Sequence, residues 1–303
     1  MIPSRRLPVA LLAVAISLAP AARASGQAKP AEPSAGQPSP ADTIYGRSGR
    51  LLARFFAPRH SMEVEPIARL FGKREQKNTS TVAVTDSASG KMMSLITLLP
   101  FGEKVNGRVG DYHLGRFPAE KHKVRSEAYE NPDGFIEVTL ENKDTPVSEH
   151  FRLSDFLTHD QKDVWPKYLV LREPLLDKLE LVLVELQRRG IDAQRLTVIS
   201  GFRSPQYNQK GVGRGGRARD SRHQFGDAAD IIVDNDRDGK LDDLNHDGHV
   251  NSKDMRIMAE AVESVERQYP ELVGGLGLYR PTRSRSPFVH VDVRGVRARW
   301  GRY

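Results

Sequence analysis

Two short segments of the sequence, residues 221–230 (SRHQFGDAAD) and 288–292 (FVHVD), contain side chains that could bind a metal ion. Asp230 begins an apolar run, where a carboxylate is costly to bury unless it is paired or binds a metal. Side chains alternate across a strand, so the second segment should direct His290 away from its valines. Two neutral imidazoles and one carboxylate suit Zn²⁺ and leave a fourth position for water, as in catalytic sites. We therefore predict that His223, Asp230 and His290 bind zinc.

Asp292 lies two residues after His290, so in a strand it projects from the same face. It is the candidate for the base that accepts a proton from zinc-bound water. The alternative is that its carboxylate orients a histidine ligand. The sequence determines the face but not the distance to the metal, so both interpretations remain open.

The two segments together resemble the D-alanyl-D-alanine carboxypeptidase and murein endopeptidase superfamily of zinc peptidases, whose relatives include the vancomycin-resistance dipeptidases and the hedgehog signalling fold. The resemblance rests on the pattern Ser-x-His-x-x-Gly-x-Ala-x-Asp, followed by a strand that carries the third histidine. Residues 200–208 (SGFRSPQYN) and 298–300 (ARW) extend it, so that it covers residues 147–300. It looks closest to the murein endopeptidase branch, which cuts peptide cross-links.

This resemblance implies a zinc enzyme that hydrolyses peptide bonds of peptidoglycan, with Arg203 stabilising the oxyanion or holding a substrate carboxylate. It also implies a mainly antiparallel sheet with flanking helices. One position departs from the pattern, because Pro287 stands where many members have an acidic residue three positions before the third zinc ligand. A D-Ala-D-Ala carboxypeptidase or dipeptidase, and a catalytically silent calcium-dependent wall-binding protein, therefore remain as alternatives.

Residues 234–254 form a dense run of aspartates and asparagines that resembles calcium loops. Oxygen-bearing side chains fall at the ligand positions of such loops, and Gly239 and Gly248 fall where the sharp turn is required. So many carboxylates repel one another unless cations neutralise them, although a solvated acidic loop is the alternative. The predicted calcium ligands are Asp234, Asp236, Asp238, Asp242, Asp243, Asn245, Asp247, Asn251 and Asp254.

The elements that must position these residues can be read from hydrophobic spacing and turn residues. Residues 174–190 predict a helix that opens at a proline and ends at a glycine, and residues 255–268 predict a second helix. Strands are expected at 196–200, 229–233, 276–279 and 288–293. Helices and strands do not alternate regularly, which favours an α+β fold.

The domain organisation follows from changes in composition along the chain. Residues 145–303 should form the zinc peptidase domain, with the calcium-loop insertion at 234–254. Residues 43–144 contain short apolar runs between turn residues, at 81–84, 93–98 and 135–140, and predict a small β-rich domain of unknown role. A short helix is expected near its start, at 61–71. Residues 25–42, rich in Pro, Ala and Ser, are typical of a flexible linker.

Residues 1–24 have a basic start, a short apolar run and a small-residue cleavage site, which predict a signal peptide. We therefore expect an exported protein, periplasmic or extracellular, without a transmembrane segment. The sequence contains no cysteine, which excludes thiolate ligands and a cysteine nucleophile. Three arginines of the predicted signal peptide contribute to the net charge of +7 and leave about +4 for the rest of the chain. A solvated basic face is the default interpretation, attraction to an anionic cell wall is the alternative, and nucleic acid is not expected as a partner. The oligomeric state is left open.

Overall fold

The computed structural model describes residues 53–56, 81–85, 92–124, 126–214, 216–283 and 285–301. The predicted signal peptide, the linker and the helix expected at 61–71 lie outside these residues. Within the described ranges, no helix is both long and apolar enough to cross a membrane.

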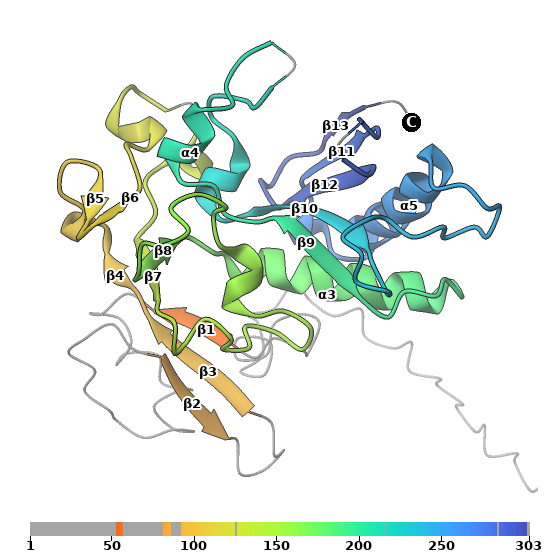
Figure 1. Cartoon of the computed structure of the whole chain (residues 1–303), viewed down its shortest axis with the longest axis horizontal. Helices are drawn as coiled ribbons and strands as arrows, with labels where there is room; N and C mark the ends of the chain where they lie inside the picture. Colours follow the sequence, from red (N-terminus) through yellow and green to blue (C-terminus); the bar gives the residue numbers. More distant parts are fainter. Residues whose placement is uncertain are drawn as a thin grey trace, which may run out of the picture. The chain divides into compact units, whose positions relative to one another are not determined.

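A five-stranded sheet, in the order β13-β11-β12-β10-β9, forms the centre of residues 196–300 (Figure 1). Its neighbouring strands are antiparallel except for β11 and β13, which are parallel. The strands span Leu196–Ser200 (β9), Ala228–Val233 (β10), Gly275–Tyr279 (β11), Phe288–Asp292 (β12) and Ala298–Trp300 (β13). All four strands predicted in this region are therefore present, and the α+β class is confirmed.

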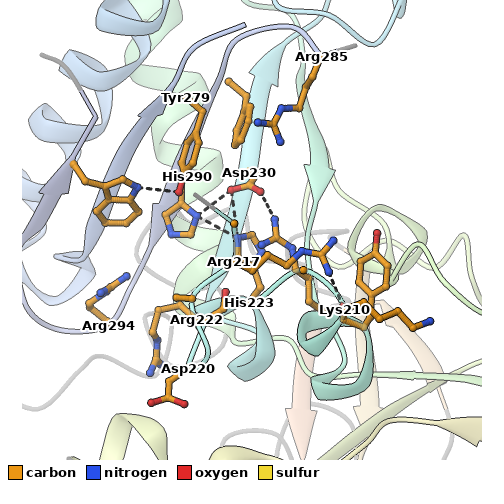
Figure 2. A pocket seen from close by; sticks show the side chains of 18 of the residues that line it. Lys210, Arg217, Asp220, Arg222, His223, Asp230, Tyr279, Arg285, His290 and Arg294 are labelled. Carbon is orange, nitrogen blue, oxygen red and sulfur yellow. Dashed lines mark hydrogen bonds and ion pairs between the residues drawn. The ribbon is translucent and has the colours of Figure 1, made fainter. Parts of the chain in front are cut away.

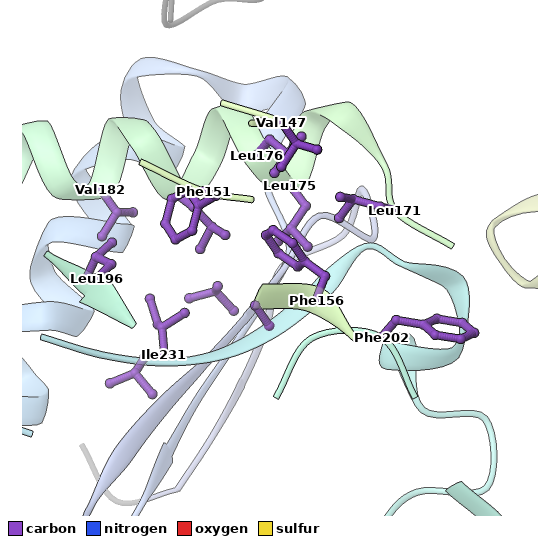
Figure 3. Close-up of a cluster of buried hydrophobic side chains, with 14 of the residues drawn as sticks. Val147, Phe151, Phe156, Leu171, Leu175, Leu176, Val182, Leu196, Phe202 and Ile231 are labelled. Carbon is purple, nitrogen blue, oxygen red and sulfur yellow. The ribbon is translucent and has the colours of Figure 1, made fainter. Parts of the chain in front are cut away.

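Two long helices, α3 (Glu173–Arg188) and α5 (Ser252–Gln268), correspond to the two predicted helices. Helix α5 packs against β11 and β12, and α3 packs against α5. Six apolar residues of α3 are fully buried because their spacing places them on one helical face: Leu175, Leu176, Leu179, Val182, Leu183 and Leu186. Figure 3 shows Leu175 and Val182 of this face on either side of Phe151, with Phe156 and Ile231 lower in the view.

A smaller sheet joins the two parts of the chain that the sequence analysis separated. Its strands, in the order β4-β7-β8, span Leu99–Pro100, Gly134–Val138 and Lys167–Leu169. The β7–β8 pairing crosses the expected boundary at residues 144 and 145. Phe117 also packs edge-on against Phe225, with ring centroids 6.5 Å apart. The β-rich part is therefore not confirmed as a separate domain.

The remaining elements are short. Strands β1 (Ala53–Phe56), β3 (Met92–Thr97) and β2 (Thr81–Thr85) form a three-stranded sheet, and β5 (Arg108–Val109) pairs with β6 (Tyr112–His113). Helix α4 spans Pro205–Gln209. The 3₁₀ helices are η1 (Phe101–Glu103), η2 (Pro118–Glu120), η3 (Glu127–Tyr129), η4 (Leu153–Phe156), η5 (Arg222–Phe225) and η6 (Pro270–Leu272). The strand expected at 135–140 ends at residue 138, where Thr139 begins a turn closed by the side chain of Asn142.

A buried lysine ties the two long helices to the strand that carries His290. Lys178 of α3 donates to Glu266 Oε1 of α5 at 2.7 Å, to the carbonyl of Leu272 at 3.0 Å and to the carbonyl of Asp292 at 2.8 Å. Burial lowers the pKa of Lys178, and the opposing carboxylate of Glu266 favours its charged form. This side chain holds the end of β12 in place against the helices.

Helix α3 ends in a cluster of opposite charges. Arg188 and Arg189 both bind the carboxylate of Glu185, at 2.8 Å each. Hydrogen bonds from Arg188, and then from Arg189, lower the pKa of Glu185 to about 2. The ionised form of Glu185 therefore stabilises the last turn of the helix.

Candidate metal centre

Three side chains from three different elements converge at one point. His223 comes from η5, Asp230 from β10 and His290 from β12, and all three are buried. Asp230 Oδ1 lies 3.3 Å from His223 Nε2 and 2.9 Å from His290 Nδ1. The two histidine nitrogens lie 3.1 Å apart. Figure 2 shows the three side chains pointing toward one another at the pocket. The structure thus brings together the residues predicted to bind zinc.

The other nitrogen of each histidine is held by an oxygen acceptor. His223 Nδ1 donates to the carbonyl of Gly201 at 2.7 Å, and His290 Nε2 donates to Asp292 Oδ2 at 3.1 Å. In these tautomers both inward nitrogens present lone pairs to Asp230 Oδ1, so the three atoms need a shared cation or proton. Ligands placed tetrahedrally around zinc at 2.0–2.1 Å lie about 3.3 Å apart, close to the distances found here. The donor set therefore fits zinc.

The ionisation of these groups follows from burial and their mutual contacts. Burial lowers the pKa of His223, which favours the neutral imidazole that a metal requires. Burial alone would raise the pKa of Asp230, but His223, His290 and Arg203 hold it well below its usual range. Burial would lower the pKa of His290, but its hydrogen bonds to Asp230 and Asp292 raise it. A proton on His290 therefore competes with a metal ion.

Local backbone geometry sets the separation between His223 and Asp230. Gly226 has a φ of +67°, and a Cβ atom there would lie 2.3 Å from the carbonyl of Val170. Only glycine fits this turn, which ends η5 and lets the chain enter β10. The β10–β12 register then places Asp230 directly opposite His290. The Ser-x-His-x-x-Gly-x-Ala-x-Asp pattern thus has a backbone requirement at its glycine.

Arg203 lies beside the three converging side chains. Its Nε donates to Ser200 Oγ at 2.9 Å, and its Nη2 donates to Asp230 Oδ2. This contact leaves Asp230 Oδ1 to face the histidines. Arg203 also lines the pocket, and its Nη1 makes no hydrogen bond within the described ranges. That atom is available to a substrate oxygen.

Asp292 contacts His290 at Nε2, the ring nitrogen that faces away from Asp230, and does not line the pocket. It is fully buried, and it accepts hydrogen bonds from Gly275 N at 2.7 Å, Arg294 Nε at 2.9 Å and His290 Nε2 at 3.1 Å. Burial would raise the pKa of Asp292, but the donors His290 and Arg294 hold it far below its usual range. A carboxylate so fully engaged is a weak proton acceptor. The geometry favours the alternative in which Asp292 orients His290.

The geometry agrees with the comparison to known families. Residues 155–300 match the model of the family described as peptidoglycan L,D-endopeptidase MepK. The match covers a little less than half of the chain and supports the murein endopeptidase branch of the zinc peptidases. The match confirms the branch expected from the sequence and supports a peptidoglycan endopeptidase. Searches of curated proteins and of solved structures found no match.

The peptidase site opens into a pocket of about 680 Å³ that is rich in cationic and aromatic side chains. The sequence analysis did not identify these residues, apart from Arg203, because they come from separate segments. The cationic residues are Arg203, Lys210, Arg217, Arg222, Arg285 and Arg294. The aromatic residues are Tyr129, Tyr207, Tyr279, Phe288 and Trp300.

Two of the pocket arginines have no carboxylate partner among the described residues. Arg217 lies over the ring of Tyr207, with its guanidinium carbon 4.1 Å from the centroid, and donates to the Tyr207 carbonyl at 2.6 Å. Arg285 lies 4.6 Å from the ring centroid of Phe288. Aromatic stacking holds these guanidinium groups in place without neutralising them. The basic composition of residues 210–222 is the signal that could have identified Arg217.

The predicted calcium ligands divide into two groups. One carboxylate oxygen each of Asp234, Asp236 and Asp238 lies within 4.8 Å of the others. No such carboxylate group is found among residues 243–254, all of which the structure describes. The remaining predicted ligands are Asp242, at the end of residues 234–242, and Asp243, Asn245, Asp247, Asn251 and Asp254, within residues 243–254.

Proposed function

We propose that this chain is a zinc endopeptidase that hydrolyses peptide bonds of bacterial peptidoglycan. The observation that carries the proposal is the convergence of His223 Nε2, Asp230 Oδ1 and His290 Nδ1 beside an open pocket. These residues would hold the metal, whose Lewis acidity activates water and polarises a peptide carbonyl. Acting on the cell wall requires export, which the signal peptide expected at residues 1–24 would provide.

The side chains around these ligands would orient the substrate and its developing negative charge. Arg203 Nη1 can donate to a substrate oxygen while its other nitrogens hold Asp230 and Ser200. Tyr279 accepts a hydrogen bond from Trp300 Nε1 at 2.9 Å, so its own hydroxyl proton is available to a substrate oxygen in the pocket. Donors already in place for such charge typically contribute a large share of catalysis.

The charge of the pocket suits a peptide that carries free carboxylates, as peptidoglycan peptides do. Arg217 and Arg285 offer guanidinium groups that no carboxylate of the described chain neutralises. Guanidinium groups bind carboxylates through paired, charge-assisted hydrogen bonds. We assign these two residues to substrate carboxylates away from the scissile bond.

One observation favours a second candidate, a wall-binding protein without catalytic activity. The pocket-lining carboxylates among the described residues are Asp230 and Asp220. Asp220 lies away from the three converging side chains in Figure 2. Pro287 also removes the acidic residue that many relatives place before the third ligand. A binder requires no general base, so only activity can separate the two candidates.

Digestion of purified sacculi by the zinc-loaded protein, followed by mass spectrometry of the released fragments, tests the proposal. Cleavage of cross-linked peptides is expected, and His223→Ala should abolish both zinc binding and cleavage. His159→Ala serves as the control, because His159 is exposed and, within the part of the chain that the structure describes, its ring bonds only the carbonyl of Ile199. Release of single D-alanine or of D-alanyl dipeptides would indicate the carboxypeptidase or dipeptidase instead. Binding to sacculi without released fragments would indicate the silent binder.

A further inference from the structure

The strand that carries Asp230 runs directly into the first acidic loop, residues 234–242. Asp234 follows β10, and only 3% of its surface is exposed. Its Oδ2 accepts a hydrogen bond from Thr197 Oγ1 of β9 at 3.1 Å. Its Oδ1 is buried, and no donor from the described residues reaches it. A buried carboxylate oxygen without a partner is costly, which indicates a missing positive ligand.

Two further carboxylates approach this unpartnered group. Asp236 and Asp238 each place an oxygen within 4.8 Å of Asp234 and of each other. The chain turns between Asp236 and Asp238 at Arg237, whose φ is +64°, and turns again just after Asp238 at Gly239, whose φ is +78°. Asp242 adds a fourth charge nearby: burial first, and then the charges of its neighbouring aspartates, raise its pKa. Among the described residues, one lysine contact reaches the three carboxylates, from Lys240 to Asp238 at the exposed edge, and no cationic side chain pairs with Asp234.

We propose that Asp234, Asp236 and Asp238 bind one divalent cation of the calcium class at the end of β10. The site offers only oxygen ligands, which suit a hard cation rather than zinc. Calcium binds oxygen at 2.3–2.6 Å, so two ligands on one ion lie at most about 5 Å apart, and the three carboxylates satisfy that limit. Water and backbone carbonyl groups complete such a coordination sphere.

The position of this site gives it a structural role toward the zinc ligands. Asp234 N donates to the carbonyl of Arg195 at 3.3 Å, and Asp242 N donates to the carbonyl of Val233 at 3.0 Å. The loop is therefore fastened to β9 and β10, four residues beyond Asp230. A bound cation holds the end of this strand without touching the zinc ligands. It should raise the stability of the fold and leave the zinc content unchanged.

The second acidic loop, residues 243–254, provides a matched control, because its carboxylates are satisfied within the chain. Asp243 accepts hydrogen bonds from Asp247 N at 3.3 Å and Gly248 N at 2.7 Å. Asp254 accepts from Leu244 N at 2.9 Å and Asn251 N at 2.7 Å. No buried oxygen of the described part of this loop lacks a partner. We therefore place the site in the first loop alone.

Calorimetric titration of the zinc-loaded full chain with Ca²⁺, after removal of calcium by a chelator, tests the proposal. About one ion per chain is expected, and Ca²⁺ at a hundred times its dissociation constant should raise the melting temperature by about 5–10 °C. Asp238→Asn should abolish binding and the thermal shift, whereas Asp247→Asn should retain both. His223→Ala should also retain the calcium response, because it removes only the zinc ligand.

Asp234→Asn provides a sharper test, because it removes the buried charge while keeping the side-chain shape. Without calcium this variant should melt above the wild type, since its amide can donate to the neighbouring carboxylates. With calcium the order should reverse, because only the wild type gains stability. A wild-type calcium response in Asp238→Asn, or loss of the response in Asp247→Asn alone, would overturn the assignment. Mg²⁺ producing an equal shift at equal concentration would overturn the calcium class.

Discussion

Replacing Asp292 by asparagine separates the two roles that the sequence allowed for this residue. The substitution keeps the shape of the side chain, but it turns one of the two acceptor oxygens into a donor. In the structure both oxygens face donors, among them His290 Nε2 and Gly275 N. One edge of the introduced amide must therefore present an N–H group to another donor. If that edge faces His290, the imidazole shifts its proton to Nδ1, the atom that faces Asp230.

The size of the effect follows from this geometry. Loss of a carboxylate that orients a metal-binding histidine typically lowers metal affinity or activity by about 10- to 100-fold, or about 1.4–2.7 kcal/mol. We expect Asp292→Asn to lose zinc affinity in this range, because a proton on His290 Nδ1 competes with the metal. Turnover at saturating zinc should approach the wild-type value. A general base, by contrast, contributes about 10²- to 10⁴-fold to the rate at any zinc concentration.

The assay is turnover on sacculi as a function of free zinc, set by a competing chelator, with zinc content measured on the same samples. Asp227→Asn is the matched control, because Asp227 is equally buried and pairs with Arg222 but touches no zinc ligand. This control should lose stability and keep its zinc affinity. Unchanged zinc affinity in Asp292→Asn, with kcat at least about 100-fold lower at saturating zinc, would refute the orienting role. Asp292 would then be the base.

Three further predictions concern the pocket and the fold. Arg217→Gln and Arg285→Gln should each raise KM for sacculi by about tenfold with little change in kcat, measured by steady-state digestion. Each substitution removes a contact that binds the substrate equally well in the ground state and the transition state, so a selective loss of kcat would contradict this role. Lys178→Met should lower the free energy of unfolding by about 3 kcal/mol in urea denaturation, because it leaves Glu266 without one buried partner; a loss below about 1 kcal/mol would contradict the bracing role. Because the pKa of Glu185 is lowered to about 2 in the folded protein, its ionised carboxylate stabilises the fold above pH 4.5, and this stabilisation is lost as the pH falls toward about 2. Glu185→Gln should therefore be less stable than the wild type at neutral pH, and the difference in the free energy of unfolding should shrink as the pH falls through that range. A difference independent of pH would show that the ionisation of this carboxylate does not contribute to stability.

Local patterns were sufficient to predict β10 and β12, which carry Asp230 and His290, and the two long helices of this part of the chain. The spacing of apolar residues predicted α3 and α5, because burial of one helical face imposes that spacing. The alternation along Phe288–Asp292 placed His290 and Asp292 on one face, and the structure joins them by a hydrogen bond. The boundary at residue 144 did not separate two cores, because strand pairing between distant segments leaves no local sequence signal.

The sequence by itself determined which residue types could bind a metal, and it placed them on a strand, a turn and a second strand. Those properties depend on neighbours within a few residues, such as Gly226 between His223 and Asp230. Only the tertiary structure decided that His290 lies opposite Asp230, that donors surround Asp292 on every side, and that arginines from separate loops share one pocket. These relations depend on distances between segments up to tens of residues apart, which packing of the sheet against its helices sets. A local pattern indicates which side chains share one face of a strand, but it does not indicate which residue of the neighbouring strand lies opposite them.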